Sequence, residues 1–351
     1  MFSCLYAQTT GSNIDGKITN ENGEPLAGAS IIATHEPTGS TFNATSLDGG
    51  FFNITNVIPG GPYTLIISEM ESQERTIANI NIDLGETFSV NIFLSQGTML
   101  SEVIVSENRS NSKGASTSIK SDKVKSIPTI TRNITDITRL VPQSNGNSAF
   151  AGASNRFNNY MVDGAAYNNN FGLGSAQFGG ENPLSIEVFD QVQVDLSPVD
   201  MALSGFTGAA VNATTKSGSN IYKAEAYSYI QNDQMIGNDP GIGKNVLRGV
   251  TFSGPILNDK IFFFANYEEY NYLLPAFSYG PSADGVGNGV TTSRVLESEL
   301  INIQTQMKNL YDYEPGLYGD NIPFANVGER LNLRLDWNIN SKQKFFIRYN
   351  N

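Results

Sequence analysis

The chain has 351 residues and carries 22 Lys and Arg against 34 Asp and Glu, a formal net charge of −12 at pH 7. Its length suggests two or three domains, and its acidic balance argues against nucleic acid as a partner, because binding phosphates requires clustered Lys and Arg. One Cys and one His are too few for a Cys/His zinc site, a disulfide or a thiol–imidazole pair, so enzymes that need these groups are excluded.

The N-terminus, residues 1–11, is similar to the end of a secretory signal peptide with Ala7 at the cleavage position. An ordinary frayed terminus is the alternative interpretation. Elsewhere no apolar run approaches the roughly 20 residues that a membrane-spanning helix needs. If the protein is an integral membrane component, we therefore expect it to cross as a β-barrel.

Residues 12–95 predict an N-terminal Ig-like β-sandwich. Short strands are predicted at intervals of about ten residues, at 14–18, 29–34, 51–54, 63–67 and 88–94. Asn22–Gly23 supplies a residue pair suited to positive φ, as tight hairpins require.

The next segment, residues 96–125, is rich in Ser, Asn and Lys and reads as a linker. Residues 126–215 have a mixed α/β pattern. A short helix is predicted after Asn133 as N-cap, with Pro142 as its stop. Strands are predicted at 159–162, 192–194 and 210–215.

Residues 216–351 predict the first strands of an antiparallel transmembrane β-barrel. Apolar and polar residues alternate without a fault over 331–339, so one face is apolar and the other polar. The predicted strands are 221–230, 246–254, 260–271, 330–340 and 343–350, and the links between them alternate between long and short, as in outer-membrane barrels. A barrel with room for an internal domain needs on the order of 22 strands, so we expect this part to be incomplete at Asn351.

Several aromatic residues of this region are expected in a girdle at the lipid interface rather than on a sugar-binding platform. They are Trp337, Tyr267, Tyr270, Tyr272 and Tyr349. Arg334 and Asp336 share the polar face and predict a charge pair inside the barrel.

No catalytic, cofactor-binding or metal-binding residues are predicted, and the chain is not expected to be an enzyme. His35 has no second imidazole with which to share a metal. Glu268 and Glu269 are neighbours in a predicted strand, so they face opposite sides and cannot flank one glycosidic bond.

Several motifs together resemble those of TonB-dependent outer-membrane receptors of the Oar-like type, which carry an N-terminal carboxypeptidase-regulatory-like sandwich. Asp48–Phe51 and Pro59–Leu65 fit the sandwich, Gly152–Ala165 is similar to the family's central plug stretch, and Gly205–Asn220 to its exit into the first barrel strand. The resemblance implies a plug domain at 126–215 followed by a barrel at 216–351. The Ile-Arg-Gly triplet common in siderophore receptors is absent, which weakens a siderophore assignment.

The segment between sandwich and plug is similar to the TonB box of such receptors, where a short β-prone stretch can add as a strand to the periplasmic C-terminal domain of TonB. The candidate residues are Ser101, Glu102, Val103, Ile104, Val105 and Ser106. A last strand of the sandwich, or a stray linker strand, is the alternative.

A second set of plug residues combines amides, an Arg and aromatic rings, and is the most ligand-like cluster in the chain. These substrate-contact candidates are Asn155, Arg156, Tyr167, Asn168, Asn169, Asn170 and Phe171. Plug–barrel contacts or solvated turns are the alternative. A helix inside the long external loop is also predicted, over residues 293–310.

The resemblance implies active uptake of an external solute across the outer membrane, with energy supplied through TonB. Its implied partners are TonB, outer-membrane lipid and an unknown external solute, with a surface lipoprotein left open, and no cofactor is implied. The alternative is a surface or periplasmic carbohydrate- or protein-binding module without transport.

Overall fold

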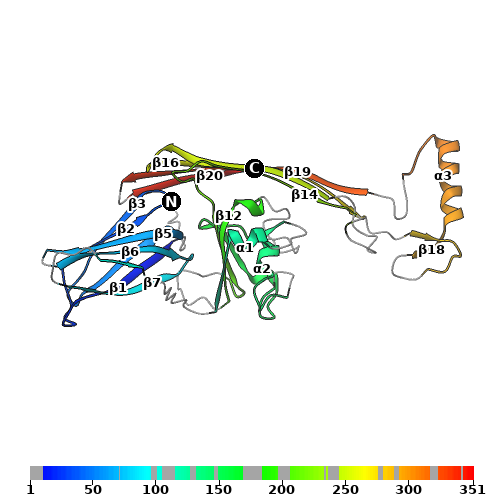
Figure 1. The fold of residues 1–351 in the computed structure, drawn as a ribbon. Coiled ribbons are helices and arrows are strands. Elements are labelled where there is room, and N and C mark those ends of the chain that lie inside the picture. The colour runs from blue at the N-terminus through cyan, green and yellow to red at the C-terminus, as the bar shows by residue number, and fades with distance from the viewer. Residues whose placement is uncertain are drawn as a thin grey trace, which may run out of the picture. The chain divides into compact units, whose positions relative to one another are not determined.

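The computed structural model describes residues 11–70, 72–95, 101–104, 115–126, 132–145, 149–168, 184–196, 206–232, 235, 245–275, 280–287, 292–316, 323–340 and 343–351. The chain divides into two compact units. One comprises Met1–Ala224, Thr251–Asn266 and Arg330–Asn351, and the other comprises Glu225–Val250 and Tyr267–Glu329. Regular structure in the described residues is mainly β-strand (Figure 1), which confirms the expected fold class. Apart from Gly11, the predicted signal-peptide remnant lies outside the described residues.

The first unit begins with a β-sandwich of two sheets, drawn in blue to cyan in Figure 1. One sheet has the order β4-β1-β7, with β1 (Ser12–Asn20), β4 (Phe51–Val57) and β7 (Thr87–Leu94). The other has the order β3-β2-β5-β6-β8, with β2 (Ser30–His35), β3 (Ser40–Thr45), β5 (Gly60–Glu69), β6 (Ser72–Ile82) and β8 (Ser101–Ile104). The predicted strands are present, and β3 and β6 are additional.

The core of the sandwich forms because apolar residues alternate along its strands. On β5, Tyr63, Leu65 and Ile67 are fully buried, and each such side chain contributes about 1.5–3 kcal/mol of burial free energy. The Tyr63 hydroxyl donates to the Ile58 carbonyl at 2.6 Å, so its polar end is satisfied. Gly16 lies where a Cβ would be 1.8 Å from the Val90 carbonyl oxygen, so only glycine fits between β1 and β7.

The second domain of this unit has a mixed sheet. It is called the plug domain below because the resemblance implies a plug in this region. The order is β11-β10-β13-β12-β9, with β9 (Ser116–Lys120), β10 (Asn159–Val162), β11 (Ala165–Ala166), β12 (Phe189–Asp195) and β13 (Ala210–Thr215). Helices α1 (Ser121–Ser126) and α2 (Ile134–Thr138) contact β12, and two short 3-10 turns, η1 (Asn155–Phe157) and η3 (Ile186–Val188), precede β10 and β12. The predicted strands of this region are confirmed.

Helix α2 starts as its sequence predicts. The Asn133 side chain accepts hydrogen bonds from the backbone of Thr135 and Asp136, and the Asn133 N–H donates to the Asp136 carboxylate, which completes a capping box. The helix ends at Arg139, before Pro142. Beside it, Arg132 pairs with Glu187 on η3, and both side chains are almost fully buried, so each charge is compensated inside the domain.

The barrel region is one sheet of five strands with the order β14-β15-β16-β19-β20. The strands are β14 (Lys223–Gln231), β15 (Asn245–Leu257), β16 (Ile261–Pro275), β19 (Pro323–Asn340) and β20 (Gln343–Asn350). Strands that follow one another here are neighbours in the sheet, and β19 and β20 are antiparallel. These strands match the five predicted for residues 216–351.

The predicted two faces of these strands are present. Leu333, Trp337 and Ile339 on β19 are all more than 40% exposed, whereas Asn332 is buried. The girdle prediction was wrong for Tyr270 and Tyr272. Tyr270 is 7% exposed and stacks on Tyr272 at 5.3 Å, while Tyr267 is exposed. Because side chains alternate along a strand, residues 270 and 272 share a face that residue 267 does not.

The second unit contains β17 (Gly280–Ser282), β18 (Thr292–Leu296) and α3 (Glu297–Tyr311). Helix α3 confirms the helix predicted over residues 293–310. None of its residues is buried. Among the described residues, no helix is long and apolar enough to cross a membrane.

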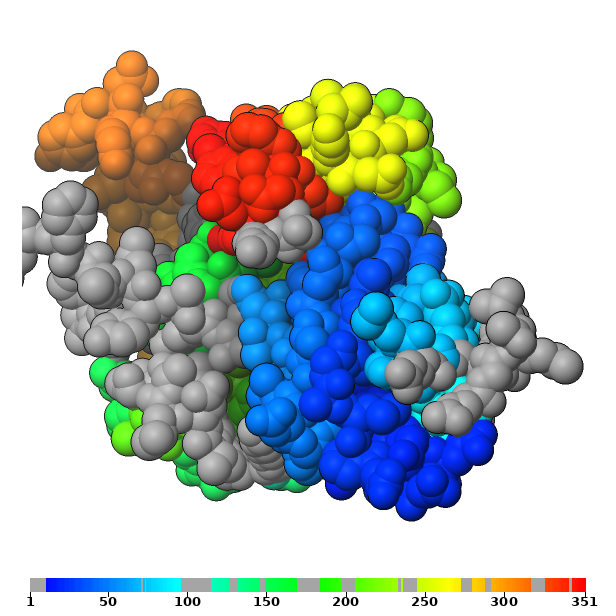
Figure 2. Space-filling model, turned by 90° about the vertical axis from the view of Figure 1, so that its left-hand side faces the viewer, coloured from blue at the N-terminus to red at the C-terminus, as the bar shows by residue number. Residues whose placement is uncertain are grey.

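Within the first unit the sandwich contacts both other parts. Its Asp83 pairs with Lys120 of β9 at 2.5 Å, and the Leu84 N–H donates to the Gln191 side chain of β12 at 2.8 Å. Toward the barrel strands, Ser40 accepts a hydrogen bond from Asn338 at 2.9 Å. Figure 2 shows the surface of the sandwich in blue and cyan. The sandwich is therefore in contact with the edge of the plug sheet and with the strand ends of the barrel.

Candidate functional site

The candidate site is centred on Asp163, in the turn between β10 and β11. Asp163 and Gly164 have φ of 47° and 79°, the positive values that a two-residue Asp-Gly hairpin requires. The Asp163 N–H donates to the Ala213 carbonyl at 2.9 Å. The turn is therefore tied to β13, and the carboxylate has a fixed position.

Thr215, the last residue of β13, holds the carboxylate from within the plug domain. Its backbone N–H donates to Asp163 Oδ1 at 2.8 Å, and its hydroxyl donates to Oδ2 at 2.7 Å. Both carboxylate oxygens of Asp163 therefore have a donor within the same domain.

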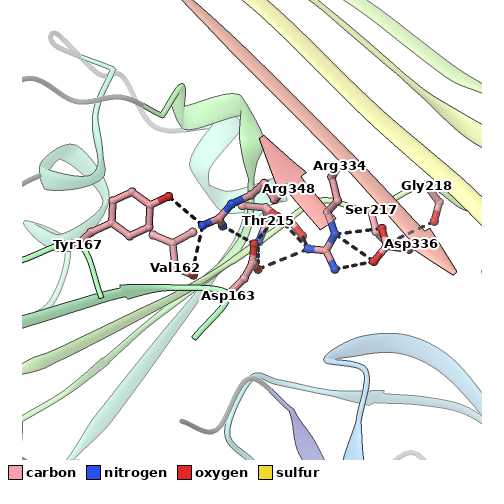
Figure 3. Close-up of polar contacts among 9 residues, drawn as sticks. All are labelled: Val162, Asp163, Tyr167, Thr215, Ser217, Gly218, Arg334, Asp336 and Arg348. Carbon is pink, nitrogen blue, oxygen red and sulfur yellow. Dashed lines mark hydrogen bonds and ion pairs between the residues drawn. The ribbon is translucent and has the colours of Figure 1, made fainter. Parts of the chain in front are cut away.

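Two arginines from adjacent barrel strands reach the same carboxylate, as Figure 3 shows. Arg334 on β19 and Arg348 on β20 are direct partners in the sheet. Arg334 Nη1 lies 3.4 Å from Asp163 Oδ1 and donates to the Thr215 hydroxyl at 2.8 Å and carbonyl at 2.9 Å. Arg348 Nη1 pairs with Asp163 Oδ2. Asp163, Thr215, Arg334 and Arg348 are called the Asp163 cluster below.

Both arginines also donate hydrogen bonds to side chains outside the cluster. Asp336 accepts two bonds from Arg334 Nε and one from Nη2 at 2.8–3.1 Å, which confirms the predicted charge pair. Arg348 Nη2 donates to the Tyr167 hydroxyl at 2.9 Å. Two carboxylates and two guanidinium groups give a neutral set, and the Asp163 side chain is only 6% exposed.

Carboxylates elsewhere in the plug domain are affected by desolvation. Burial raises the pKa of Asp190 on β12, and the positive charges of Lys216 and Arg334 oppose this shift. Burial likewise raises the pKa of Asp195, which hydrogen bonds from Ser116 and Gln193 oppose. In both aspartates, neighbouring donors or cations thus counteract the effect of burial.

The arrangement joins residues of the plug sheet to residues of two barrel strands. Among the described residues, no group of three or more His, Cys, Asp or Glu side chains could hold a metal ion. The charges of the Asp163 cluster are engaged with one another rather than directed at a free position. Its chemical role is a polar contact between plug domain and barrel strands.

The predicted substrate-contact residues lie in two places. Asn155 and Arg156 are in η1. Tyr167 accepts hydrogen bonds from Arg348 and from Asn350 at 2.9 and 3.0 Å, a plug–barrel contact. Asn168 bonds the backbone of Tyr160 and the side chain of Asn159 at 2.7 and 2.6 Å, and so closes its own hairpin. Asn169, Asn170 and Phe171 lie outside the described residues.

The predicted TonB-box residues are described in part. Ser101–Ile104 form β8, which runs parallel to β6 at the edge of the larger sandwich sheet. This is the geometry of the alternative interpretation, a last strand of the sandwich. Val105 and Ser106 lie outside the described residues.

Sequence reasoning missed Asp163, Thr215 and the convergence of the two arginines on them. Asp163–Gly164 carried the signal of a tight hairpin, but not of an ionic contact. The alternation of β19 and β20 does assign Arg334 and Arg348 to the polar face. Their meeting with a residue 171 and 185 positions away has no local signal.

Comparison with known proteins agrees with this architecture. Residues 13–95 match the carboxypeptidase regulatory-like domain, and residues 214–351 match an outer membrane beta barrel domain. The chain thus combines an N-terminal carboxypeptidase regulatory-like sandwich with a region that matches an outer membrane beta barrel domain, and a barrel domain of this kind is located in the outer membrane.

More particularly, the chain is similar to the TonB-dependent transporter Oar of Myxococcus xanthus. The two are 25% identical over 295 residues, which is 76% of this chain and 27% of the relative, so the chain spans about a quarter of the length of that relative. Among solved structures, the siderophore receptor PirA of Acinetobacter baumannii has a TM-score of 0.45 at 15% identity, covering 67% of this chain and 31% of that one. The transporter YddB of Escherichia coli has a TM-score of 0.41 at 16% identity, covering 64% and 31%.

Proposed function

We propose that this chain supplies the plug and part of the barrel of a transporter that takes up an external solute across the outer membrane, with energy from TonB. The observation that carries the proposal is the Asp163 cluster. A carboxylate on the plug domain is held by arginines from two adjacent barrel strands. A domain that blocks a channel must be bound to the channel wall, and the Asp163 cluster binds the plug domain to the barrel strands.

The ionic character of the Asp163 cluster suits a plug that has to move. Buried ion pairs add little net stability, because the desolvation of the charges offsets most of their attraction, yet they specify geometry strongly. Water can replace the partners when the plug is displaced. The Asp163 cluster therefore favours one position of the plug without making that position permanent.

Energy would enter through residues 101–106. A short β-prone segment can add as a strand to a folded partner. From β8 the chain leads through residues 105–115 to β9, which is the edge strand of the plug sheet and pairs only with β12 among the described strands. A pull on residues 101–106 would thus load β9 before the rest of the plug.

In the proposed function, no bond of the solute is made or broken. Glu268 and Glu269 bond to different tyrosines, Tyr227 and Tyr267, as residues on opposite faces of a strand do. His35 is 6% exposed and bonds to Thr38 at 2.8 Å inside the sandwich. These groups are used in packing, which supports a transporter rather than a hydrolase.

The test is a titration of the purified full-length protein with the C-terminal domain of TonB. We expect binding by the wild type and by Val103→Ala, and at least tenfold weaker binding by Val103→Pro, because proline removes a backbone donor from the strand. Equal binding by Val103→Pro would rule out strand addition. Failure of the wild type to bind would instead favour the alternative of a binding module without transport.

A further inference from the structure

Strand β8 has an unusual position for a segment expected to lie in a linker. It forms the end of the sheet β3-β2-β5-β6-β8 and pairs in parallel register with β6, Arg75 with Ser101 through Ala78 with Ile104. It is reached from β7, which ends at Leu94 in the other sheet, through residues 95–100. The segment is therefore an integral strand of the sandwich.

The strand that carries β8 is firmly held. Arg75, at the start of the shared register, donates to the Phe93 carbonyl at 2.8 Å, and its guanidinium lies 4.4 Å from the centre of the Phe93 ring. This side chain joins β6 to β7 across the two sheets. Two residues further on, Ile77 is buried in the core. The inner edge of β8 is therefore paired with a strand that is held both by its contact with β7 and by the core.

The outer edge of β8, in contrast, is not paired with any described strand. Its outward N–H and C=O groups therefore form the free edge of the sheet. Such an edge is a template for one more strand from another chain. Because the segment is already extended, a partner strand does not have to supply the entropy cost of ordering it.

We propose that β8 is a preformed docking edge, and that the periplasmic partner adds its strand to the outer side of β8 while β8 stays paired with β6. This rests on the proposed function, in which TonB is that partner. The sandwich then holds β8 next to the plug, because Asp83 and Leu84 of the sandwich contact Lys120 and Gln191 of the plug sheet. In this arrangement the partner extends the sandwich sheet by one strand.

Hydrogen exchange of the full-length protein with and without the C-terminal domain of TonB tests the proposal. We expect the amides of residues 101–104 to exchange at least tenfold more slowly when TonB is bound, while those of residues 75–78 remain protected. Strand β3, the other end of the same sheet, is the matched control and should not change. Loss of protection at residues 75–78 on TonB binding would overturn the proposal, because β8 would then have left the sheet.

A disulfide between β6 and β8 gives an independent test. Thr76 and Glu102 are direct Cα partners, so the pair Thr76→Cys and Glu102→Cys, made in a Cys4→Ser background, lies within disulfide reach. We expect the oxidised protein to bind TonB within about threefold of the reduced protein, since neighbouring strands need not separate.

The outcomes separate the two proposals. Binding that falls tenfold or more on oxidation would show that the segment has to be released from β6, and would refute the docking edge while leaving TonB coupling intact. If neither the reduced protein nor the wild type binds TonB, the proposed function itself fails.

Discussion

Asp163 is the residue on which the plug–barrel contact depends most. Its carboxylate accepts bonds from Thr215 of the plug and faces both Arg334 and Arg348 of the barrel strands. Asp336 lies on the same side but contacts only Arg334 in this set, and it is more exposed, at 20% against 6%. The two aspartates therefore differ in the number of cations that depend on them.

Asp163→Asn is expected to lower the free energy of unfolding of the plug by about 3–5 kcal/mol, because it leaves two buried arginines without their shared counter-charge. Asp336→Asn, the matched control, should cost about 1 kcal/mol. Thermal unfolding of the purified full-length variants measures the difference. In the double variant Asp163→Asn/Arg348→Gln part of the loss should be recovered. Equal losses for both aspartates would contradict this role of Asp163.

His35 makes the stability of the sandwich depend on pH. Burial, and to a lesser extent the charge of Lys344, lowers its pKa from 6.5 to about 4. The folded state holds His35 neutral while the unfolded chain takes up a proton below pH 6.5. This stabilisation is complete above about pH 6.5 and is lost as the pH falls toward 4.

We therefore expect the sandwich to lose up to about 3 kcal/mol from this group between pH 6.5 and pH 4. His35→Gln removes the titrating group and serves as the reference in which only carboxylates contribute. The measurement is the unfolding free energy of both proteins over that range. If the two proteins show the same slope, His35 does not account for the dependence.

At the scale of elements, periodicity predicted the strands well and the contacts between domains poorly. The alternation over 331–339 predicted β19, and Asn133 predicted the start of α2. Strand β3 was missed because Ser40–Thr45 is largely polar and half exposed. The Asp163 cluster was missed because it joins three segments that are distant in sequence, and local pattern carries no information on such contacts.

Gly16 tests whether the pairing of β1 with β7 organises the sandwich. Gly16→Ala would place a Cβ 1.8 Å from the Val90 oxygen, so we expect a loss of at least about 3 kcal/mol in stability. Gly23→Ala is the matched control. Gly23 has φ of 82° with no atom within 4 Å, and only the backbone cost of about 1–2 kcal/mol applies. Chemical denaturation distinguishes the two, and similar losses would mean that the β1–β7 contact can relax.

At the scale of the molecule, one path joins the sandwich to the plug and the barrel strands. It runs from β8 on the sandwich through residues 105–115 to β9 at the edge of the plug sheet, and further along the chain to Asp163. The contacts of β9 with β12 come first on this path, and the Asp163 cluster comes last. A pull should therefore unfold the plug from β9 onward and stop where the arginines hold Asp163.

The most direct measurement is the extension of the full-length protein in a bilayer when it is pulled through a tethered C-terminal domain of TonB. Residues 105–162 lie between β8 and Asp163. We therefore expect the chain to lengthen by about 200 Å before the Asp163 cluster resists further extension. Asp163→Asn should pass this point at lower force, with the barrel still in place. Detachment of TonB without any extension, or extraction of the barrel before the plug yields, would contradict the account.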